Sequence, residues 1–135
     1  QDGQVIGINT AKANADNLGF SIPINTAKAI VEKIVEGKNY TRPTLGISGM
    51  DVKTYTAYTG QSPDVNSGII VRSVSSGSVA DKAGLKAGDI ITKIGDSEIK
   101  TMNDLSKKLY SYSSGSKDTI TVYRDGKATD LKISF

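Results

Sequence analysis

The chain has 135 residues, enough for one domain of ordinary size or for one domain and part of another. It contains no Cys and no His, which excludes disulfides, thiolate or imidazole metal ligands, and catalysis by Ser-His-Asp or Cys-His groups. The net charge of +3 comes from 17 basic and 14 acidic residues mixed along the chain, so a nucleic-acid surface is not expected. No window of about 18 apolar residues occurs, and we expect neither membrane insertion nor a cofactor.

The first 43 residues predict an incomplete arrangement of two strands and one helix. The strands are expected at residues 4–9 and 18–24. Asn25 or Thr26 is a suitable N-cap for the helix, which Gly37 ends. Its apolar residues recur at helical spacing: Ala27, Ile30, Val31, Ile34 and Val35. Because two strands and one helix cannot bury a core by themselves, we expect residues 1–37 to belong to something larger, followed by a polar linker at 38–43.

From residue 44 onward the pattern predicts a complete β-rich domain. Strands are expected at 45–50, 68–74, 89–94, 119–123 and 128–135, with a short one at Ile99. Two helices are expected, a short one capped by Ser76 or Ser78 that runs through Ala83, and a longer one from Thr101 to about Tyr112. Asp125-Gly126 is a strong hairpin signal. The polar connection at 51–67 is expected to hold at most one helical turn.

The run Thr44-Leu45-Gly46-Ile47 is the motif most indicative of function. A glycine between two apolar residues leaves the backbone bare, so that successive N–H groups can point at one anion. The strand that follows offers an edge on which a peptide can lie as an extra strand. The same pattern opens many ordinary strands, but here it resembles the carboxylate-binding loop of PDZ domains.

Residues 80–91 (Ala-Asp-Lys-Ala-Gly-Leu-Lys-Ala-Gly-Asp-Ile-Ile) also resemble the signature segment of PDZ domains. Gly84 ends a short helix, and Gly88-Asp89 turns the chain into a buried strand. A single glycine at the end of a helix or in a turn before a strand is common in proteins of many folds. The ensemble implies an α+β fold, a PDZ-like, partly open β-barrel or sandwich of five to six strands with two helices.

Three stretches extend the resemblance over essentially the whole chain. They are residues 3–10 (Gly-Gln-Val-Ile-Gly-Ile-Asn-Thr), 18–25 (Leu-Gly-Phe-Ser-Ile-Pro-Ile-Asn) and 42–47 (Arg-Pro-Thr-Leu-Gly-Ile). In this order they resemble the HtrA family, the DegP/Do-like serine proteases with a trypsin-like protease domain. The resemblance implies that residues 1–37 are a strand-strand-helix remnant of the protease β-barrel, 38–43 a linker, and 44–135 a PDZ domain. The family's catalytic segments would precede residue 1, so no catalytic residue is expected here.

The resemblance also assigns the residues of a peptide-binding groove. The carboxylate-binding loop would comprise Thr44, Leu45, Gly46 and Ile47, with the N–H groups of the last three holding a peptide's terminal carboxylate. The peptide would pair with Ser48, Gly49 and Met50. The hydrophobic pocket and the groove helix would supply Leu45, Ile47, Met102, Ser106 and Leu109, whereas Leu105 faces the core. Such a small aliphatic pocket would take a terminal Val, Leu, Ile, Ala or Phe.

Several of these assignments have a plainer alternative. Met102 and Leu109 could belong to the core, and Arg42 is either an electrostatic helper for the carboxylate or a solvated linker residue. Tyr40, Tyr55 and Tyr58 could cover the groove or contact a protease domain, but packing of the long connection is the simpler account.

The resemblance implies capture of hydrophobic C-terminal peptides of unfolded or misfolded proteins by strand addition, for delivery to the protease domain or for its regulation. The alternative is an assembly or regulatory module with an occluded groove. Without His or Cys, an independent enzyme is disfavoured. The resemblance further implies a homotrimeric parent, a monomeric fragment, and a location outside the cytoplasm, at the cell surface or in the periplasm, with an upstream helix anchoring some members in the membrane.

Overall fold

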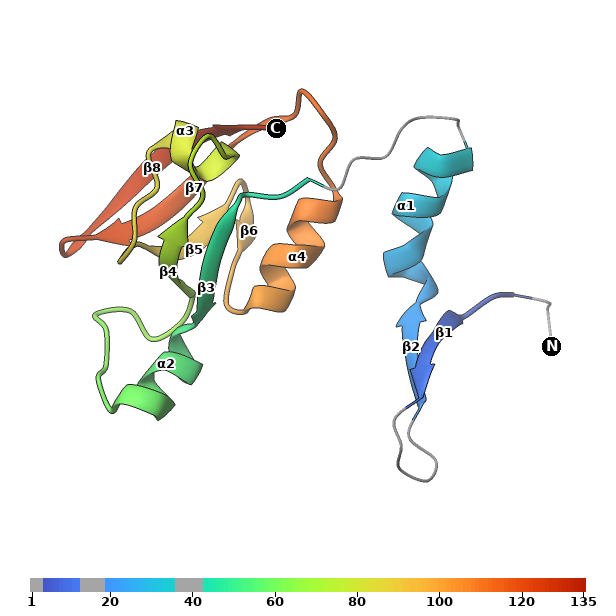
Figure 1. Ribbon diagram of the computed structural model, residues 1–135, viewed down its shortest axis with the longest axis horizontal. Helices are drawn as coiled ribbons and strands as arrows, with labels where there is room; N and C mark the ends of the chain where they lie inside the picture. The colour runs from blue at the N-terminus through green and yellow to red at the C-terminus, as the bar shows by residue number, and fades with distance from the viewer. Residues whose placement is uncertain (1–3, 13–18, 36–42) are drawn as a thin grey trace. The chain divides into compact units, whose positions relative to one another are not determined.

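The chain folds into two compact units, Gln1–Thr41 and Arg42–Phe135. The computed structural model describes residues 4–12, 19–35 and 43–135 (Figure 1). Several predicted features lie outside these described residues: the helix end at Gly37, Tyr40, the linker up to residue 42 and the predicted helper Arg42.

The first unit consists of one hairpin and one helix. Strand β1 (Gly7–Lys12) pairs antiparallel with β2 (Gly19–Pro23), with an irregular register between Asn9 and Ala11. Helix α1 (Ile24–Val35) follows directly. The first strand therefore lies about three residues later than predicted, and the helix begins one or two residues before the predicted caps. The Ile24 N–H donates to the Ile6 carbonyl (3.0 Å) and ties the start of the helix to the chain before β1.

The second unit is an antiparallel sheet with three short helices, which confirms the predicted α+β class and adds one helix to the two expected (Figure 1). The strands are β3 (Ile47–Asp51), β4 (Ile69–Val74), β5 (Ile90–Ile94), β6 (Ser97–Glu98), β7 (Lys117–Arg124) and β8 (Lys127–Ser134). The helices are α2 (Val52–Thr59), α3 (Val79–Ala83) and α4 (Met102–Tyr110). The order across the sheet is β3-β4-β5-β7-β8, and β6 pairs with β5. The β7–β8 hairpin turns at Asp125 and Gly126, which both have positive φ.

Local sequence signals explain most of these bounds. The Ser78 side chain accepts a hydrogen bond from the Asp81 N–H and caps α3, and Thr101 forms a capping box with Asp104 at the start of α4. Helix α2 differs from the prediction, because the 51–67 connection holds eight helical residues instead of at most one turn. Gly60 ends α2 in the left-handed region (φ 70°), donating its N–H to the Thr56 carbonyl.

The core of the second unit lies between the sheet and helices α3 and α4. Its buried side chains are Leu45, Ile69, Val71, Ala80, Leu85, Ile91, Ile94, Ile99, Leu105, Tyr112, Ile120, Val122 and Ile133. Every strand from β4 to β8 except the short β6 contributes to this set, which is the reason the unit is compact without disulfides. Within the described ranges, no helix is long and apolar enough to cross a membrane.

A buried ion pair ties the connection between α3 and β5 to β7. Arg124 donates through Nε and Nη2 to both carboxylate oxygens of Asp89 (2.6 and 2.7 Å), and through Nη2 to the Gly84 carbonyl (2.8 Å). The Asp89 carboxylate also accepts from the Lys86 N–H (2.8 Å) and is 1% exposed. These contacts satisfy a buried charge that would otherwise be very costly.

Candidate functional site

The loop before β3 has its carbonyl groups engaged by the protein. The Leu45 carbonyl accepts from the Ala80 N–H at the start of α3 (2.9 Å), and the Gly46 carbonyl accepts from the Ser75 N–H (2.8 Å). Across the described part of the chain, no hydrogen bond from the N–H of Leu45 or Gly46 is found. Since the Leu45 side chain is buried in the core, the loop is fixed in place while these two donors have no protein acceptor.

Gly46 is required by the geometry of this loop. Its φ of +75° lies in the left-handed region, and a Cβ atom there would stand 2.4 Å from the Ser78 Cβ. A side chain at this position would therefore displace both the loop and the cap of α3. The structure thus gives a physical reason for the glycine in the predicted carboxylate-binding loop.

The same loop determines which way Ile47 faces. Within the sheet, β3 is an edge strand whose neighbour is β4. The bond from Ser75 to Gly46 makes this a hydrogen-bonded position of the antiparallel pair. Because bonded and non-bonded positions alternate, the next residue, Ile47, directs its N–H and C=O groups away from β4 toward the open edge.

The other end of β3 gives the same alternation. The Val52 N–H donates to the Gly68 carbonyl (2.9 Å), so that Asp51 and Gly49 fall on non-bonded positions and also face the open edge. The register shift between Ser48 and Gly49 is compensated by an extra residue in β4, so β3 itself stays regular. The backbone groups of Ile47, Gly49 and Asp51 are therefore positioned to pair with an added strand.

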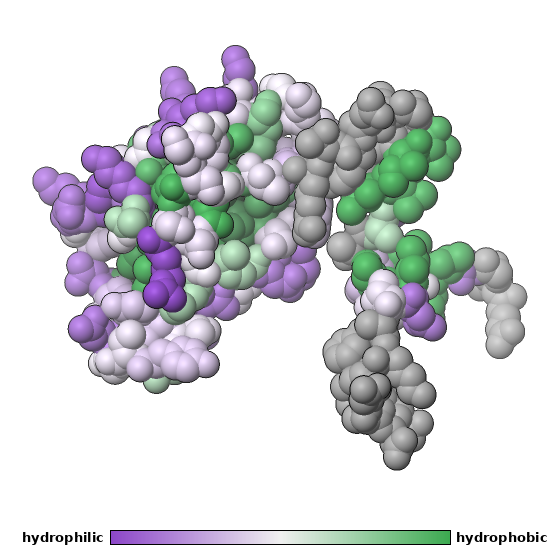
Figure 2. All heavy atoms as spheres, viewed as in Figure 1, coloured by the Kyte–Doolittle hydropathy of each residue, from purple (hydrophilic) through white to green (hydrophobic). Residues whose placement is uncertain are grey.

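Helix α4 lies beside β3 and presents one face to the core (Figure 1). Leu105 is buried (3% exposed), as predicted from its spacing. Met102, Ser106 and Leu109 are half-buried, and the two apolar ones pack against the edge of the core. Figure 2 shows apolar side chains in the middle of the face where α3, β3 and α4 lie, bordered by polar ones.

Asp51 links the end of β3 to the start of α4. Its Oδ1 atom accepts a hydrogen bond from the Met102 N–H (2.7 Å), and the same residue is the N-cap of α2. The carboxylate satisfies one of the orphan donors of α4 and stabilises the positive end of the helix. It therefore fixes the spacing between the edge strand and the helix at one end of the groove.

The C-terminal end of α4 is held by a second polar cluster. The Tyr112 hydroxyl donates to the Asp118 carboxylate, and the Tyr112 ring stacks on Phe135 with centroids 4.7 Å apart. The Lys108 ammonium lies 3.8 Å from that carboxylate and 5.3 Å from the centre of the Tyr112 ring. The hydrogen bond from Tyr112 lowers the pKa of Asp118, with further help from the Thr119 N–H and the charge of Lys108. Burial raises the pKa of Tyr112, so its hydroxyl stays protonated and donating.

The structure brings most of the predicted groove residues together. Leu45, Gly46 and Ile47 form the loop and the start of β3, Ser48, Gly49 and Met50 continue the edge strand, and Met102, Ser106 and Leu109 lie along α4. Thr44 is exposed before the loop. Of the predicted pairing strand, Gly49 faces the open edge with its backbone, whereas Ser48 and Met50 bond toward β4. The roles of these residues in binding remain predictions.

Two positioning residues were not found from the sequence. Asp51 was read as the start of a polar connection, although an Asp that directly follows a strand is a suitable helix N-cap. Tyr112 was read as the last apolar residue of the helix, but it lies beyond α4 and bonds Asp118. The patterns around both residues did not show their distant partners.

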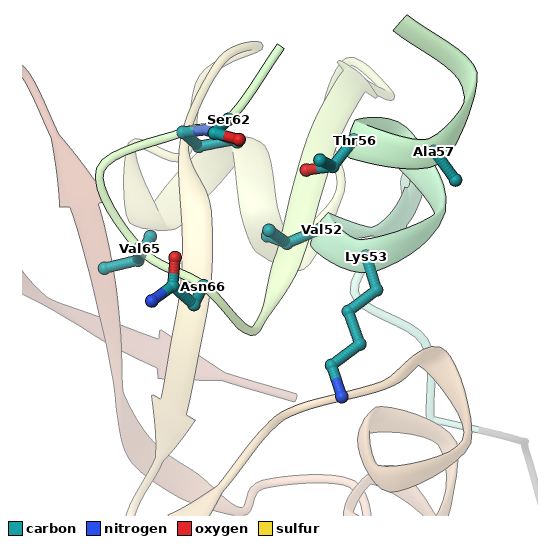
Figure 3. Close-up of a pocket in the computed structure, with 8 residues that line it drawn as sticks. Val52, Lys53, Thr56, Ala57, Ser62, Val65 and Asn66 are labelled. Atoms are coloured by element: carbon teal, nitrogen blue, oxygen red, sulfur yellow. The ribbon is translucent and has the colours of Figure 1, made fainter. Parts of the chain in front are cut away.

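Three cavities surround α2 on the outer face of the sheet. One of about 320 Å³ lies between α2 and the following loop, where Val52 and Thr56 point toward the loop that carries Ser62, Val65 and Asn66 (Figure 3). A second, of about 290 Å³, is lined by Tyr55 and Ile70, and a third, of about 370 Å³, is lined by Tyr55, Met50 and Tyr58. Within the described ranges, no cluster of three or more carboxylate, His or Cys groups that could hold a metal is found.

The sequence of the second unit was compared with models of known protein families. Residues 43–135 match the family model described as PDZ domain. Since this match covers more than half of the chain, the chain belongs to the PDZ domain family.

The chain is also similar to PDZ-containing serine proteases. The chain is 37% identical over 147 residues to the serine protease Do-like HtrA of Lactococcus lactis, covering 98% of this chain and 36% of the relative. It is 36% identical over 136 residues to a probable periplasmic serine protease do/HhoA-like of Haemophilus influenzae (98% and 29% covered). The solved HtrA-type protease AlgW with decapeptide superimposes with a TM-score of 0.77 at 27% identity, over 98% of this chain and 42% of that chain. The second unit is thus a PDZ domain similar to the PDZ regions of HtrA/DegP-like serine proteases, and the chain spans about a third of the curated relatives' length.

Proposed function

We propose that the second unit binds hydrophobic C-terminal peptides of unfolded or misfolded proteins by adding them as a strand to β3. The observation that carries this proposal is the combination of an open edge on β3 with the N–H groups of Leu45 and Gly46 at its start. A terminal carboxylate held at that loop makes the peptide run antiparallel to β3, between the strand and α4. Leu45, Ile47 and Leu109 then supply the pocket for the last side chain.

The expected affinity is modest. Burying one aliphatic side chain contributes about 1.5 to 3 kcal/mol. A dissociation constant of about 10 µM requires roughly 7 kcal/mol. The carboxylate and the strand hydrogen bonds must therefore contribute the remainder, so removing the charge of the terminal carboxylate should weaken binding strongly.

In the full-length protein, this binding serves a serine endopeptidase, by delivery of substrates or by regulation of its activity. The relatives are named serine proteases, and one solved relative is described with a decapeptide. We assign residues 1–37 to the end of the protease domain, through which the parent forms a homotrimer. The periplasmic description of one relative supports a location outside the cytoplasm.

A titration with peptides tests the proposal directly. A fluorescent peptide that ends in Ala-Ala-Val as a free acid should bind the chain in the micromolar range, while the matched C-terminal amide should bind at least tenfold more weakly. Leu109→Asp should abolish binding of the acid. The exposed Asn103→Asp on the same helix is the matched control for charge and should bind like the original protein.

Thermal melts separate lost binding from lost folding, because Leu109 also packs against the core. Equal affinity for acid and amide would contradict carboxylate recognition. Absence of binding in a folded protein would favour an occluded assembly or regulatory module.

A further inference from the structure

The outer face of the β3–β4 pair carries a patch that the groove does not use. Ile69 and Val71 are buried in the core, so their neighbours Ile70 and Arg72 lie on the opposite face. Met50 pairs with Ile70 and shares that face. The side chain of Met50 therefore points away from the core, next to the open edge.

Helix α2 lies beside this patch and forms a cavity with it. The third cavity, of about 370 Å³, is lined by Met50, Tyr55, Tyr58, Thr59 and Arg72. Its lining is a thioether, two phenol rings, a threonine side chain and a single guanidinium, which suits an aromatic side chain through ring, sulfur and cation–π contacts.

The residues that line the cavity differ in how firmly the protein holds them. The Tyr55 hydroxyl donates to Gln61 Oε1 (2.8 Å), which holds that ring in place. Tyr58 is 84% exposed, and Arg72 forms no ion pair with the described residues. An exposed phenol ring and an unpaired cation beside an apolar hollow leave contacts available to a ligand.

The register of β3 determines which peptide residue reaches this cavity. With the terminal residue opposite Ile47, the third residue from the end lies opposite Gly49, and both side chains face α4. The fourth residue from the end then lies opposite Met50, and its side chain projects onto the outer face. A peptide that follows β3 therefore presents its fourth side chain beside Met50, at the mouth of the cavity.

We infer that the cavity formed by Met50, Tyr55, Tyr58, Thr59 and Arg72 is a specificity subsite for an aromatic side chain at the fourth position from a ligand's C terminus. This inference rests on the proposed function, since it needs a peptide paired with β3. It adds a preference that the groove between β3 and α4 cannot provide, because that groove contacts alternate side chains only.

Three free-acid peptides test the subsite in the 135-residue chain. They are Gly-Ser-Ala-Ala-Ala-Val, Gly-Ser-Phe-Ala-Ala-Val, with Phe fourth from the end, and Gly-Ser-Ala-Ala-Phe-Val, with Phe second from the end. The fourth-position Phe should tighten binding about threefold to tenfold relative to the alanine peptide. Tyr58→Ala should remove that gain and leave the affinity for the alanine peptide unchanged. Tyr58→Phe should retain the gain, as should Thr54→Ala, an exposed position of α2 outside the cavity.

The outcomes separate the two hypotheses. Equal affinity for the alanine and fourth-position Phe peptides would overturn the subsite while the proposed function stands. A gain that survives Tyr58→Ala, or an equal Tyr58-dependent gain for the second-position Phe, would also overturn it. If neither the alanine nor the Phe peptides bind, the proposed function fails, and the subsite fails with it.

Discussion

The two units contain similar apolar residues but use them differently. In the second unit, thirteen buried side chains form one continuous core. In the first unit, Ala27 is the one buried hydrophobic residue among those whose side chains are described, while Val5, Ile6, Ile8, Ile22, Val31, Ile34 and Val35 are exposed (Figure 2). The difference shows that an amphipathic pattern predicts an element, whereas burial needs a second layer for that element to pack against.

The largest expected effect tests this contrast with the same substitution in each unit. Ile91→Ala, at a side chain with no exposure, should lower the free energy of unfolding by about 4 kcal/mol through lost burial and a residual cavity. Ile34→Ala, at a side chain 59% exposed, should change it by less than about 0.5 kcal/mol. Urea unfolding followed by tyrosine fluorescence measures both. Similar losses would contradict the difference in burial.

The second test compares an ion pair in each unit. Arg124→Ala leaves the Asp89 carboxylate buried without its partner and should cost about 3 kcal/mol. Lys28→Ala removes the exposed Lys28–Glu32 pair (3.8 Å) of α1 and should cost about 0.3 kcal/mol. Denaturation at neutral pH, repeated in high salt, checks both values. A small effect of Arg124→Ala would show that water or another cation replaces the guanidinium.

The smallest expected effect concerns acid stability within the second unit. The hydrogen bond from Tyr112 lowers the pKa of Asp118 in the folded state, so its contribution to stability is present above the usual aspartate range near pH 4 and is lost as the pH falls through the lowered value. The free energy of unfolding should therefore decline from pH 5 to pH 2, and less steeply in Asp118→Asn. Parallel declines in both proteins would exclude Asp118 as a contributor.

Much of the fold was predictable because the signals are local. Ser78 and Thr101 were expected as helix caps and are caps, and Asp125-Gly126 was expected to form the hairpin turn and does. Helix α2 was missed because its sequence, Val-Lys-Thr-Tyr-Thr-Ala-Tyr-Thr, is rich in β-branched and aromatic residues with weak helix propensity. The left-handed Gly60 at its end and the buried Val52 at its start stabilise it instead.

The candidate site was predictable in part. Leu105 was expected in the core and is buried, and Met102 and Leu109, which are half-buried on α4, pack against the core, while their role in binding stays a prediction. The cavity beside Met50 gave no signal in the sequence, because it needs α2, β3 and β4 to meet. The plain account of Tyr55 as a packing residue agrees with its place beside the sheet, whereas Tyr58 is exposed.

The sequence by itself determined the backbone requirements of this protein: a bare glycine at residue 46, β-branched strands, and caps at the helix starts. The tertiary structure alone decided that the edge of β3 stays open beside α4, that Asp51 binds the Met102 N–H 51 residues away, and that Asp89 meets Arg124 across 35 residues. The physical reason is the separation along the chain over which each interaction acts. Propensities and caps act within a few neighbouring residues, whereas the spacing of a groove depends on groups that only the completed core brings together.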